Sequence, residues 1–268
     1  MTPVMEKRWR LRQANGEQIA LFERELGLSP LVARVLVNRG IQGVDGGRRF
    51  LSSTLADIRD PLGMKGIMEG VQRLLVAHSR QEQICIYGDY DVDGVTAVAL
   101  LVHALRRFGF LVTYHIPRRL EDGYGLNAES LREIAARGAT LVVTVDCGIT
   151  AQDEALLARQ LGMDLIITDH HTPGDQLPEA CAVINPLQPG CDYPFKSLAG
   201  VGIAFALLIA LRSRFRQEGL FGEEEEPNLR QYLDLVALGT IADVVPLVEE
   251  NRIFVRHGLL ELTAARRA

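Results

Sequence analysis

The sequence predicts an α/β protein built on a parallel five-stranded sheet with helices on both faces. Short apolar segments rich in β-branched residues recur along the chain, and segments with helical periodicity separate most of them. These segments are continuously apolar and do not alternate between apolar and polar residues. Continuous apolar strands are typical of parallel sheets that are covered on both faces. The expected strands are residues 83–87, 110–116, 140–146, 164–168 and 181–185.

Helices are expected between these strands. They span residues 95–109, 128–138 and 150–162, and residues 128–138 end on a glycine, a common helix stop. Beyond the fifth strand, residues 200–215 and 227–247 are expected to be helical, and a last helix begins near residue 251.

The first 75 residues predict a helical and irregular extension. Residues 29–40 begin with a serine in the N-cap position and a proline in the first helical position, and they end on glycine. Residues 66–80 form a second amphipathic pattern.

Composition excludes several classes of protein. The chain has 268 residues, of which 47% are apolar and 24% charged, as in an ordinary soluble domain. No membrane-spanning run and no secretory h-region is present, and the four cysteines include no CxxC pair, so a cytoplasmic location with reduced thiols is expected. The net charge of −5 argues only weakly against nucleic acid, because bound cations would offset it.

Acidic and imidazole side chains follow three of the predicted strands. They are Asp89, Asp91, Asp93, Asp146, Asp169, His170 and His171. The carboxyl ends of parallel strands meet at one edge of a sheet, so these side chains are expected to lie together. Asp243 interrupts an apolar helical segment and is a further candidate.

Each of these residues, taken alone, has a structural explanation. Asp93 can serve as a turn residue or helix cap, and Asp243 can be a buried carboxylate bonded to backbone. Together, however, they place like charges side by side without compensation, which is costly. Mixed Asp and His ligands suit Mn²⁺ or Zn²⁺ better than a lone Mg²⁺. Two such ions activate water and stabilise a phosphoryl transition state, which predicts hydrolysis of a phosphate ester.

Four segments resemble, in order and spacing, the motifs of the DHH phosphoesterase superfamily: "YGDYDVDGVTA", "VVTVDCGI", "IITDHHTPG" and "LGTIADVVPL". Three more, "EDGYGL", "INP" and "SLAGVGIAF", narrow the resemblance to the RecJ family of bacterial single-strand-specific 5′→3′ DNA exonucleases. The resemblance implies metal-dependent hydrolysis of single-stranded DNA in repair and recombination, with two Mn²⁺ ions or alternatively Mg²⁺.

The resemblance also implies a domain organisation. Residues 1–75 would be an N-terminal extension, residues 76–248 the catalytic domain, and residues 249–268 the start of a helix that links to further domains. The DHH-associated and OB-type domains of the family are expected to be absent, so the chain resembles the catalytic N-terminal half. In a full-length protein, a single-strand binding protein or a helicase is a candidate partner; neither a membrane nor a nucleotide cofactor is expected.

The resemblance assigns roles to the site residues. The implied metal ligands are Asp89, Asp91, Asp93, Asp146, His170 and Asp243. Asp146 is the expected bridge between two ions, and Asp89 is either a ligand or a neighbour of one. His171 is expected to contact the scissile phosphate and to act in catalysis together with Asp146 and His170. Asp169 is expected to orient a histidine.

Other candidates and other functions stay open at this stage. Arg118 and Arg119 can neutralise substrate phosphates or be a solvated pair. Gly200 and Gly202 can present backbone amides to a phosphate or serve helix packing. The alternative functions are hydrolysis of short oligonucleotides or dinucleotides, and a binding module that has lost catalysis. A nucleotide-cofactor oxidoreductase is disfavoured, because carboxylates and not a GxGxxG segment follow the first strand.

Overall fold

The computed structural model describes residues 10–118, 123, 125–221 and 226–264. The chain forms two compact units, Met1–Ala56 and Asp57–Ala268. The first unit contains the helices α1 (Gly16–Leu26), α2 (Pro30–Asn38) and α3 (Gly43–Ser52). They enclose a small core around Phe22, Ala33 and Leu36. As the sequence predicted, Ser29 is the N-cap of α2 and its side chain accepts from the N–H of Val32.

The second unit holds the sheet. Its strands are β1 (Gln83–Gly88), β2 (Leu111–His115), β3 (Leu141–Val145), β4 (Asp164–Thr168) and β5 (Ala182–Ile184). Its α-helices are α4 (Ile67–Arg80), α5 (Val92–Arg107), α6 (Ala128–Ala136), α7 (Gln152–Gln160), α8 (Gly200–Gln217), α9 (Leu233–Ala242) and α10 (Glu249–Thr263). Short 3₁₀ turns are η1 (Leu55–Asp57), η2 (Pro61–Gly63) and η3 (Leu229–Tyr232).

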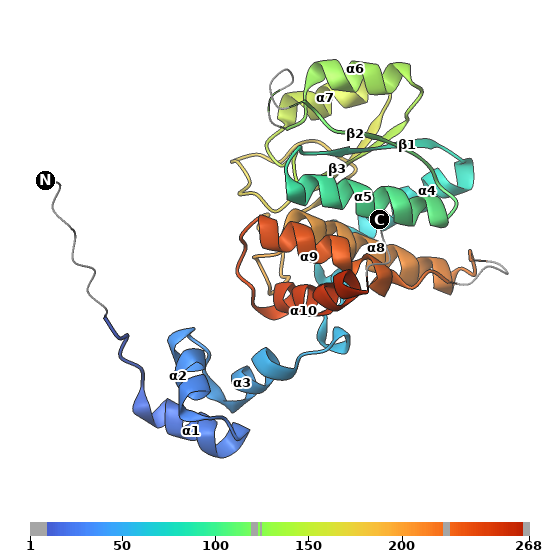
Figure 1. Cartoon of the computed structure of the whole chain (residues 1–268). Helices are drawn as coiled ribbons and strands as arrows, with labels where there is room; N and C mark the ends of the chain where they lie inside the picture. The colour runs from blue at the N-terminus through green and yellow to red at the C-terminus, as the bar shows by residue number, and fades with distance from the viewer. Residues whose placement is uncertain (1–9, 119–122, 124, 222–225, 265–268) are drawn as a thin grey trace, which may run out of the picture. The chain divides into compact units, whose positions relative to one another are not determined.

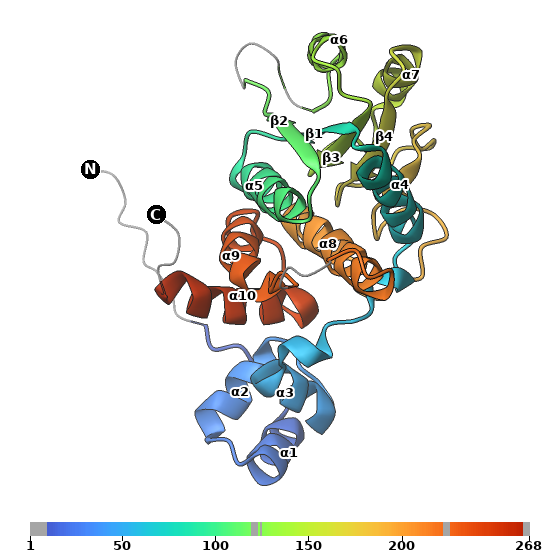
Figure 2. The same ribbon diagram turned by 90° about the vertical axis from the view of Figure 1, so that its right-hand side faces the viewer.

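The predicted parallel five-stranded sheet is confirmed. Its strand order is β2-β1-β3-β4-β5, and every neighbouring pair is parallel. Helices α6 and α7 cover one face, whereas α4, α5 and α8 cover the other (Figure 1 and Figure 2). β1 and β3 are neighbours at the point where the strand order reverses: β2 is added on the outer side of β1, and β4 and β5 are added on the outer side of β3. In such sheets a ligand site forms beyond the carboxyl ends of these central strands.

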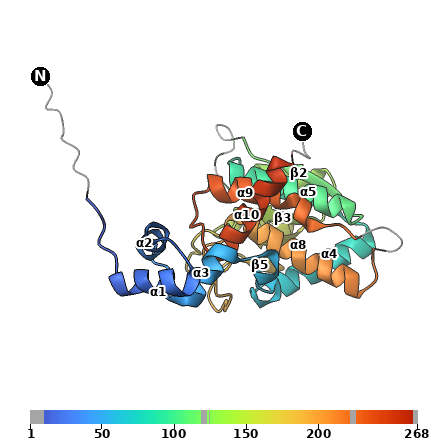
Figure 3. The same ribbon diagram turned by 60° about the horizontal axis from the view of Figure 1, so that its bottom comes forward.

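Helices α8, α9 and α10 pack together below the sheet, and they lie in front of the strands in Figure 3. Helix α4, which the sequence placed largely in the N-terminal extension, belongs to this second unit. Its Gly70 approaches β5 so closely that a Cβ there would lie 3.0 Å from Cδ1 of Ile184. Within the described residues, no helix is long and apolar enough to cross a membrane.

The expected last helix, α10, packs tightly against α9. A Cβ on Gly258 would collide with the carbonyl oxygen of Leu233 and would lie 2.5 Å from Cβ of Ala237. The continuous helix expected over residues 227–247 is broken, with η3 leading into α9, and α9 ends at Ala242. This end places Asp243 just beyond the last turn of the helix.

Substituting Gly258 by alanine is expected to destabilise the second unit, because the added methyl group has no space between α10 and α9. Overpacking of this kind costs about 1–3 kcal/mol, which corresponds to a fall of roughly 2–10 °C in the melting temperature. Thermal unfolding followed by circular dichroism measures the change. Gly174→Ala is the matched control, because a Cβ there meets nothing closer than 3.9 Å. Equal melting temperatures for the two variants would contradict this tight helix contact.

Candidate metal centre

The first acidic segment joins the end of β1 to the start of α5. Asp89 follows β1 directly and is buried. Asp91 is the N-cap of α5, and its Oδ1 accepts from the N–H of Gly94 at 2.9 Å. Asp93 lies in the first helical turn with 1% of its surface exposed. The "DG" pair at residues 93 and 94 indicated a turn, but both residues lie in the first turn of α5, and the chain changes direction before them, at Asp89 to Asp91. The three carboxylates are thus divided between a strand end and a helix start.

The carboxylate of Asp93 is held by the N-terminus of α8. Its Oδ2 accepts from the N–H of Gly200 at 2.6 Å, and its Oδ1 accepts from the N–H of Val201 at 2.9 Å. The first N–H groups of a helix have no partner within the helix and carry partial positive charge, so they stabilise a carboxylate. Each oxygen of Asp93 keeps a lone pair for a further partner.

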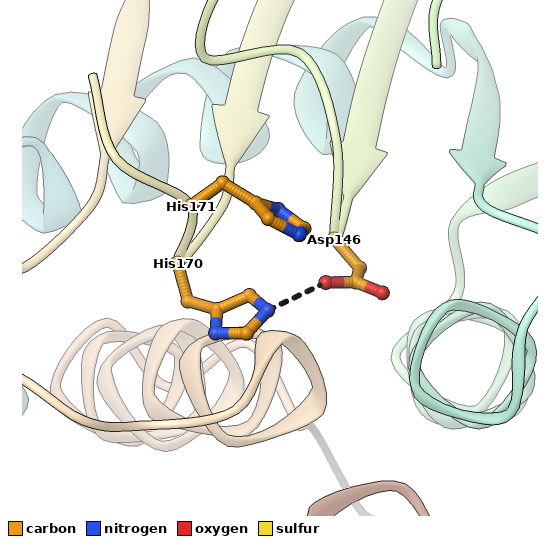
Figure 4. A group of neighbouring side chains, drawn as sticks. All are labelled: Asp146, His170 and His171. Carbon is orange, nitrogen blue, oxygen red and sulfur yellow. Dashed lines mark ion pairs between the residues drawn. The ribbon is translucent and has the colours of Figure 1, made fainter. Parts of the chain in front are cut away.

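Asp146 follows β3 in a left-handed backbone conformation, with φ at 61°. Its N–H donates to the carbonyl oxygen of Thr168 at 3.0 Å, which ties this turn to β4. Aspartate tolerates the left-handed region better than most residues do, although the conformation still costs on the order of 1 kcal/mol. The turn directs the carboxylate toward His170 (Figure 4).

His170 brings three segments of the chain together. Its Nε2 lies 3.1 Å from Oδ1 of Asp146, 3.7 Å from Oδ2 of Asp243 and 4.0 Å from Oδ2 of Asp93. These carboxylates come from the turn after β3, the end of α9 and the start of α5. The structure thus places an imidazole from the end of β4 among carboxylates that are far apart in the sequence.

Three buried atoms at this point lack a hydrogen bond within the described part of the chain. They are Oδ1 of Asp146, Nε2 of His170 and Oδ2 of Asp243. Nε2 of His170 and Oδ1 of Asp146 lie 3.1 Å apart as an ion pair, and neither atom has a further hydrogen-bond partner among the described residues. A buried polar atom without a partner is unfavourable, and a cation between these atoms would serve all three.

The ligand atoms form three groups, in each of which all atoms lie within 4.8 Å of one another. The groups are Asp89, Asp91 and Asp146; Asp93, His170 and Asp243; and Asp146, His170 and His171. Together they contain every residue that the sequence proposed as a metal ligand. Asp146 and His170 each belong to two groups, and the role of Asp146 as a bridge between two ions stays a prediction. Oxygen and imidazole nitrogen donors in this number fit Mn²⁺.

The electrostatics of the cluster favour a cation. Burial raises the pKa of Asp146 to about 7, and the charge of Asp93 adds to the effect. Burial likewise raises the pKa of Asp93 to about 6. Burial lowers the pKa of His170, but the neighbouring Asp146, Asp243 and Asp93 outweigh it and raise the value to about 9. Without a cation, the cluster therefore retains protons in place of the missing positive charge.

Asp169 organises the turn that carries both histidines. Its Oδ1 accepts from the N–H groups of His170 at 2.7 Å and His171 at 3.0 Å, and its Oδ2 accepts from the N–H of Ile149 at 2.9 Å. The histidine ring that it contacts is that of His171, whose Nδ1–H donates to Oδ1 at 2.7 Å. Although burial opposes ionisation, the hydrogen bonds from His171 and the backbone lower the pKa of Asp169. The hydrogen bond to Asp169 in turn raises the pKa of His171.

Two glycines make room for the carboxylates, and the sequence reasoning did not identify this role. A Cβ on Gly200 would lie 2.6 Å from Oδ1 of Asp146, and a Cβ on Gly239 would lie 2.8 Å from Oδ1 of Asp93. Glycine inside a helix costs about 1 kcal/mol relative to alanine, so Gly239 in the apolar "LGTIAD" segment was an available signal.

Asn185 is a further residue whose role sequence reasoning missed, although "INP" marked its position. It is fully buried, and its Nδ2 donates to the carbonyl oxygen of His171 at 2.9 Å. Its Oδ1 accepts from the N–H of Leu187 at 2.7 Å. Asn185 thus supports the histidine turn from the side of β5.

The residues proposed to bind substrate phosphates have different positions. Gly200 gives its N–H to Asp93, and a Cβ on Gly202 would lie 3.3 Å from Cδ2 of Leu198, so both favour the packing alternative. Arg118 is exposed beyond β2. Arg119 lies outside the described residues. Phosphate binding by these four residues stays a prediction.

The fold and the site together define a metal-binding α/β domain of the phosphoesterase type. The model of the DHH family, N-terminal domain, matches residues 83–240, and the chain belongs to this family. The match covers all the proposed ligands except Asp243, which lies just beyond it.

The chain is similar to curated single-stranded-DNA-specific exonucleases named RecJ. It is 44% identical to the protein of Bacillus subtilis (strain 168) over 260 residues, which is 97% of this chain and 31% of the relative. It is 42% identical to the protein of Escherichia coli (strain K12) over 265 residues, which is 98% of this chain and 45% of the relative. The chain thus spans less than half the length of these relatives.

Solved structures agree with the curated relatives. A crystal structure of exonuclease RecJ bound to manganese matches with a TM-score of 0.68 and 39% identity, covering 79% of this chain and 50% of that one. The RecJ of Thermus thermophilus in complex with Mn²⁺ matches with a TM-score of 0.77 and 33% identity, covering 97% of this chain and 35% of that one.

Proposed function

We propose that this chain is the catalytic core of a RecJ-type phosphodiesterase that hydrolyses single-stranded DNA from the 5′ end with two divalent ions, Mn²⁺ foremost. The observation that carries the proposal is that Asp146, His170 and Asp243 bring together buried atoms for which the described part of the chain offers no hydrogen-bond partner. The relatives named above support the substrate and the ion, since they are single-stranded-DNA-specific exonucleases and both solved RecJ structures hold manganese. The complete set of donors argues against a binding module that has lost catalysis.

The chain's own residues divide the work of the reaction. Asp146 and His170 hold the centre of the site, and Asp93 is fixed to α8 in a position to share an ion with His170. Ions bound there would supply a hydroxide nucleophile and would stabilise the charge of the phosphoryl transition state. His171 keeps Nδ1–H on Asp169, which leaves Nε2 to donate a proton or a hydrogen bond to the scissile phosphate. The raised pKa of His171 favours the protonated form that this role requires.

Digestion of labelled single-stranded DNA tests the proposal. A strand labelled at the 5′ end and the same strand labelled at the 3′ end are incubated with the chain in Mn²⁺, beside a thymidine dinucleotide. Early release of the 5′ label as a mononucleotide, prevented by EDTA, is the expected result. Absence of any Mn²⁺-dependent product would contradict the proposal. Cleavage of the dinucleotide alone would support the alternative substrate class.

Replacing Asp169 by asparagine is expected to lower the rate of hydrolysis about 100-fold, which is the usual cost of losing a partner that orients a metal-site histidine. The amide cannot accept from all the donors that now meet the carboxylate, and it no longer raises the pKa of His171. NMR titration of the histidine ring measures that pKa, and steady-state kinetics measure the rate. The control is Asp175→Asn, an exposed aspartate of the same loop. A His171 pKa that does not fall in the Asp169 variant would contradict the role assigned to Asp169.

Location and partners belong to the same proposal. All four cysteines are free thiols, which suits a reducing, cytoplasmic compartment. Single-stranded DNA is the proposed macromolecular partner; a single-strand binding protein or a helicase would act with the full-length protein.

A further inference from the structure

Val244 has an unusual backbone conformation directly beside the metal centre. It follows Asp243 with φ at 61°, in the left-handed region, and 85% of its surface is exposed to solvent. The described residues include four non-glycine positions with positive φ, and Val244 is the β-branched one among them. The position just after a helix end is one where glycine or asparagine is usual, because a branched side chain is strained there.

The fold does not account for a valine at this position. An exposed side chain adds little to the core, and glycine would adopt the same conformation without strain. The backbone contact that closes α9, from the N–H of Val244 to the carbonyl oxygen of Ile241 at 3.2 Å, is available to any residue except proline. Strain that packing does not explain is typical of sites that contact a ligand.

The residues around Val244 indicate what kind of ligand its side chain would contact. Asp243, the preceding residue, points Oδ2 to within 3.7 Å of Nε2 of His170. Ile241, on the last turn of α9, is also exposed, at 43%. The end of α9 therefore combines a ligand carboxylate with two aliphatic side chains that face solvent. A phosphodiester has a charged phosphate and, next to it, the apolar faces of a sugar and a base.

We propose that Val244 contacts the substrate, its side chain packing against the nucleoside next to the phosphate that is cleaved. This inference rests on the proposed function and adds a residue that positions the strand for it. The isopropyl group offers dispersion and hydrophobic contact alone, so it recognises sugar and base surface and not the phosphate. The contact acts on binding of the substrate more than on the chemical step.

Three variants separate the contact from the backbone effect. Val244→Gly removes both the side chain and the strain. Val244→Asn keeps a side chain of similar size that tolerates the left-handed region but is polar. Val244→Ile keeps the apolar contact. The matched control is Gln81→Gly, because Gln81 ends α4 with φ at 53°, at the start of β1 and thus at the opposite edge of the sheet.

The experiment measures binding, kinetics and stability on the whole chain. Calorimetry with Ca²⁺ gives the dissociation constant of a 5′-phosphorylated thymidine dinucleotide without relying on hydrolysis. Kinetics in Mn²⁺ give kcat and KM, and thermal unfolding gives the melting temperature. Val244→Gly and Val244→Asn are expected to raise the dissociation constant and KM about 5- to 10-fold, with kcat within about twofold, since the loss of one apolar contact has effects of this order. Their melting temperatures should be unchanged or about 2 °C higher. Val244→Ile and Gln81→Gly should bind the dinucleotide as the unaltered chain does.

The outcomes distinguish the two proposals. If the unaltered chain does not hydrolyse DNA in Mn²⁺ but binds the dinucleotide, and the glycine and asparagine variants bind it less tightly, then the proposed function fails and the contact stands. Unchanged binding in both variants overturns the contact. A melting temperature lowered by about 5 °C or more in both variants shows that the side chain serves the fold and also overturns it. Failure of the unaltered chain to bind the dinucleotide overturns it as well.

Discussion

Asp146→Asn is expected to lower Mn²⁺-dependent hydrolysis by about 10³-fold or more and to weaken Mn²⁺ binding by about 100-fold. Asp146 belongs to two of the three groups of ligand atoms, so its loss removes a donor from both of these groups. Asparagine has nearly the same shape, and the left-handed backbone at this position tolerates it. The expected effect is therefore one of charge and of ligand chemistry.

The same variant should fold well without metal. Removing one of several neighbouring carboxylates relieves repulsion, so the metal-free variant is expected to be at least as stable as the unaltered chain at pH 8. Mn²⁺ should then raise its melting temperature far less. Calorimetric titration measures the affinity, and thermal unfolding with EDTA or Mn²⁺ measures the stability. Glu133→Gln, on the exposed surface of α6, is the control. Full activity of Asp146→Asn would refute the metal centre as it is described above.

The second large effect concerns pH and metal together. The pKa of Asp146 is raised from 3.8 to about 7, and that of His170 from 6.5 to about 9. Between its unfolded and its folded pKa, each group is protonated in the folded chain and deprotonated in the unfolded chain. Their contribution to stability is complete below the unfolded values and is lost as pH rises through the folded values. The metal-free protein is therefore expected to lose several kcal/mol of stability from about pH 5 to pH 9.

A divalent ion should reverse this dependence. Ions bind the deprotonated ligands, so their affinity and the stability that they add both rise with pH. Thermal unfolding at pH 5.5, 7 and 8.5, with EDTA or with Mg²⁺, measures the two curves. The double variant Asp146→Asn with His170→Gln removes two of the groups with raised pKa values, leaving Asp93 among others, and should make the metal-free curve shallower. A metal-free melting temperature that rises steadily over this pH range would contradict the electrostatics of the cluster.

The sequence was sufficient to predict the sheet because its strands are short apolar segments with little local ambiguity. The edge at which the acidic residues gather follows from parallel topology alone, so the neighbourhood of Asp93, Asp146 and His170 was also predictable. Asp243 was harder, since an aspartate in an apolar helix has a common structural explanation. Its place in the cluster depends on α9 ending at Ala242, which the apolar pattern over residues 227–247 does not reveal.

What the sequence did not predict are contacts between distant segments. Nothing near Asp93 indicates that the first turn of α8 holds its carboxylate, and nothing near Asp169 indicates that its ring partner is His171 and not His170. Gly239 was visible as a glycine in a helix, but the side chain that it accommodates lies on α5. These details are decided by tertiary packing, on which local patterns carry no information.

The bond between Asp93 and Gly200 joins residues 107 positions apart. Asp243 completes the cluster still later in the chain, after all five strands have been made. A growing polypeptide can therefore form the five strands, and with them bring Asp146 and His170 to one edge of the sheet, before Asp243 joins them. Because contacts between such distant residues are slow to form, the cluster is expected to assemble late in folding. A nascent chain that has not yet reached residue 243 would lack one of the proposed metal ligands, so its metal site would be incomplete until that residue has been added.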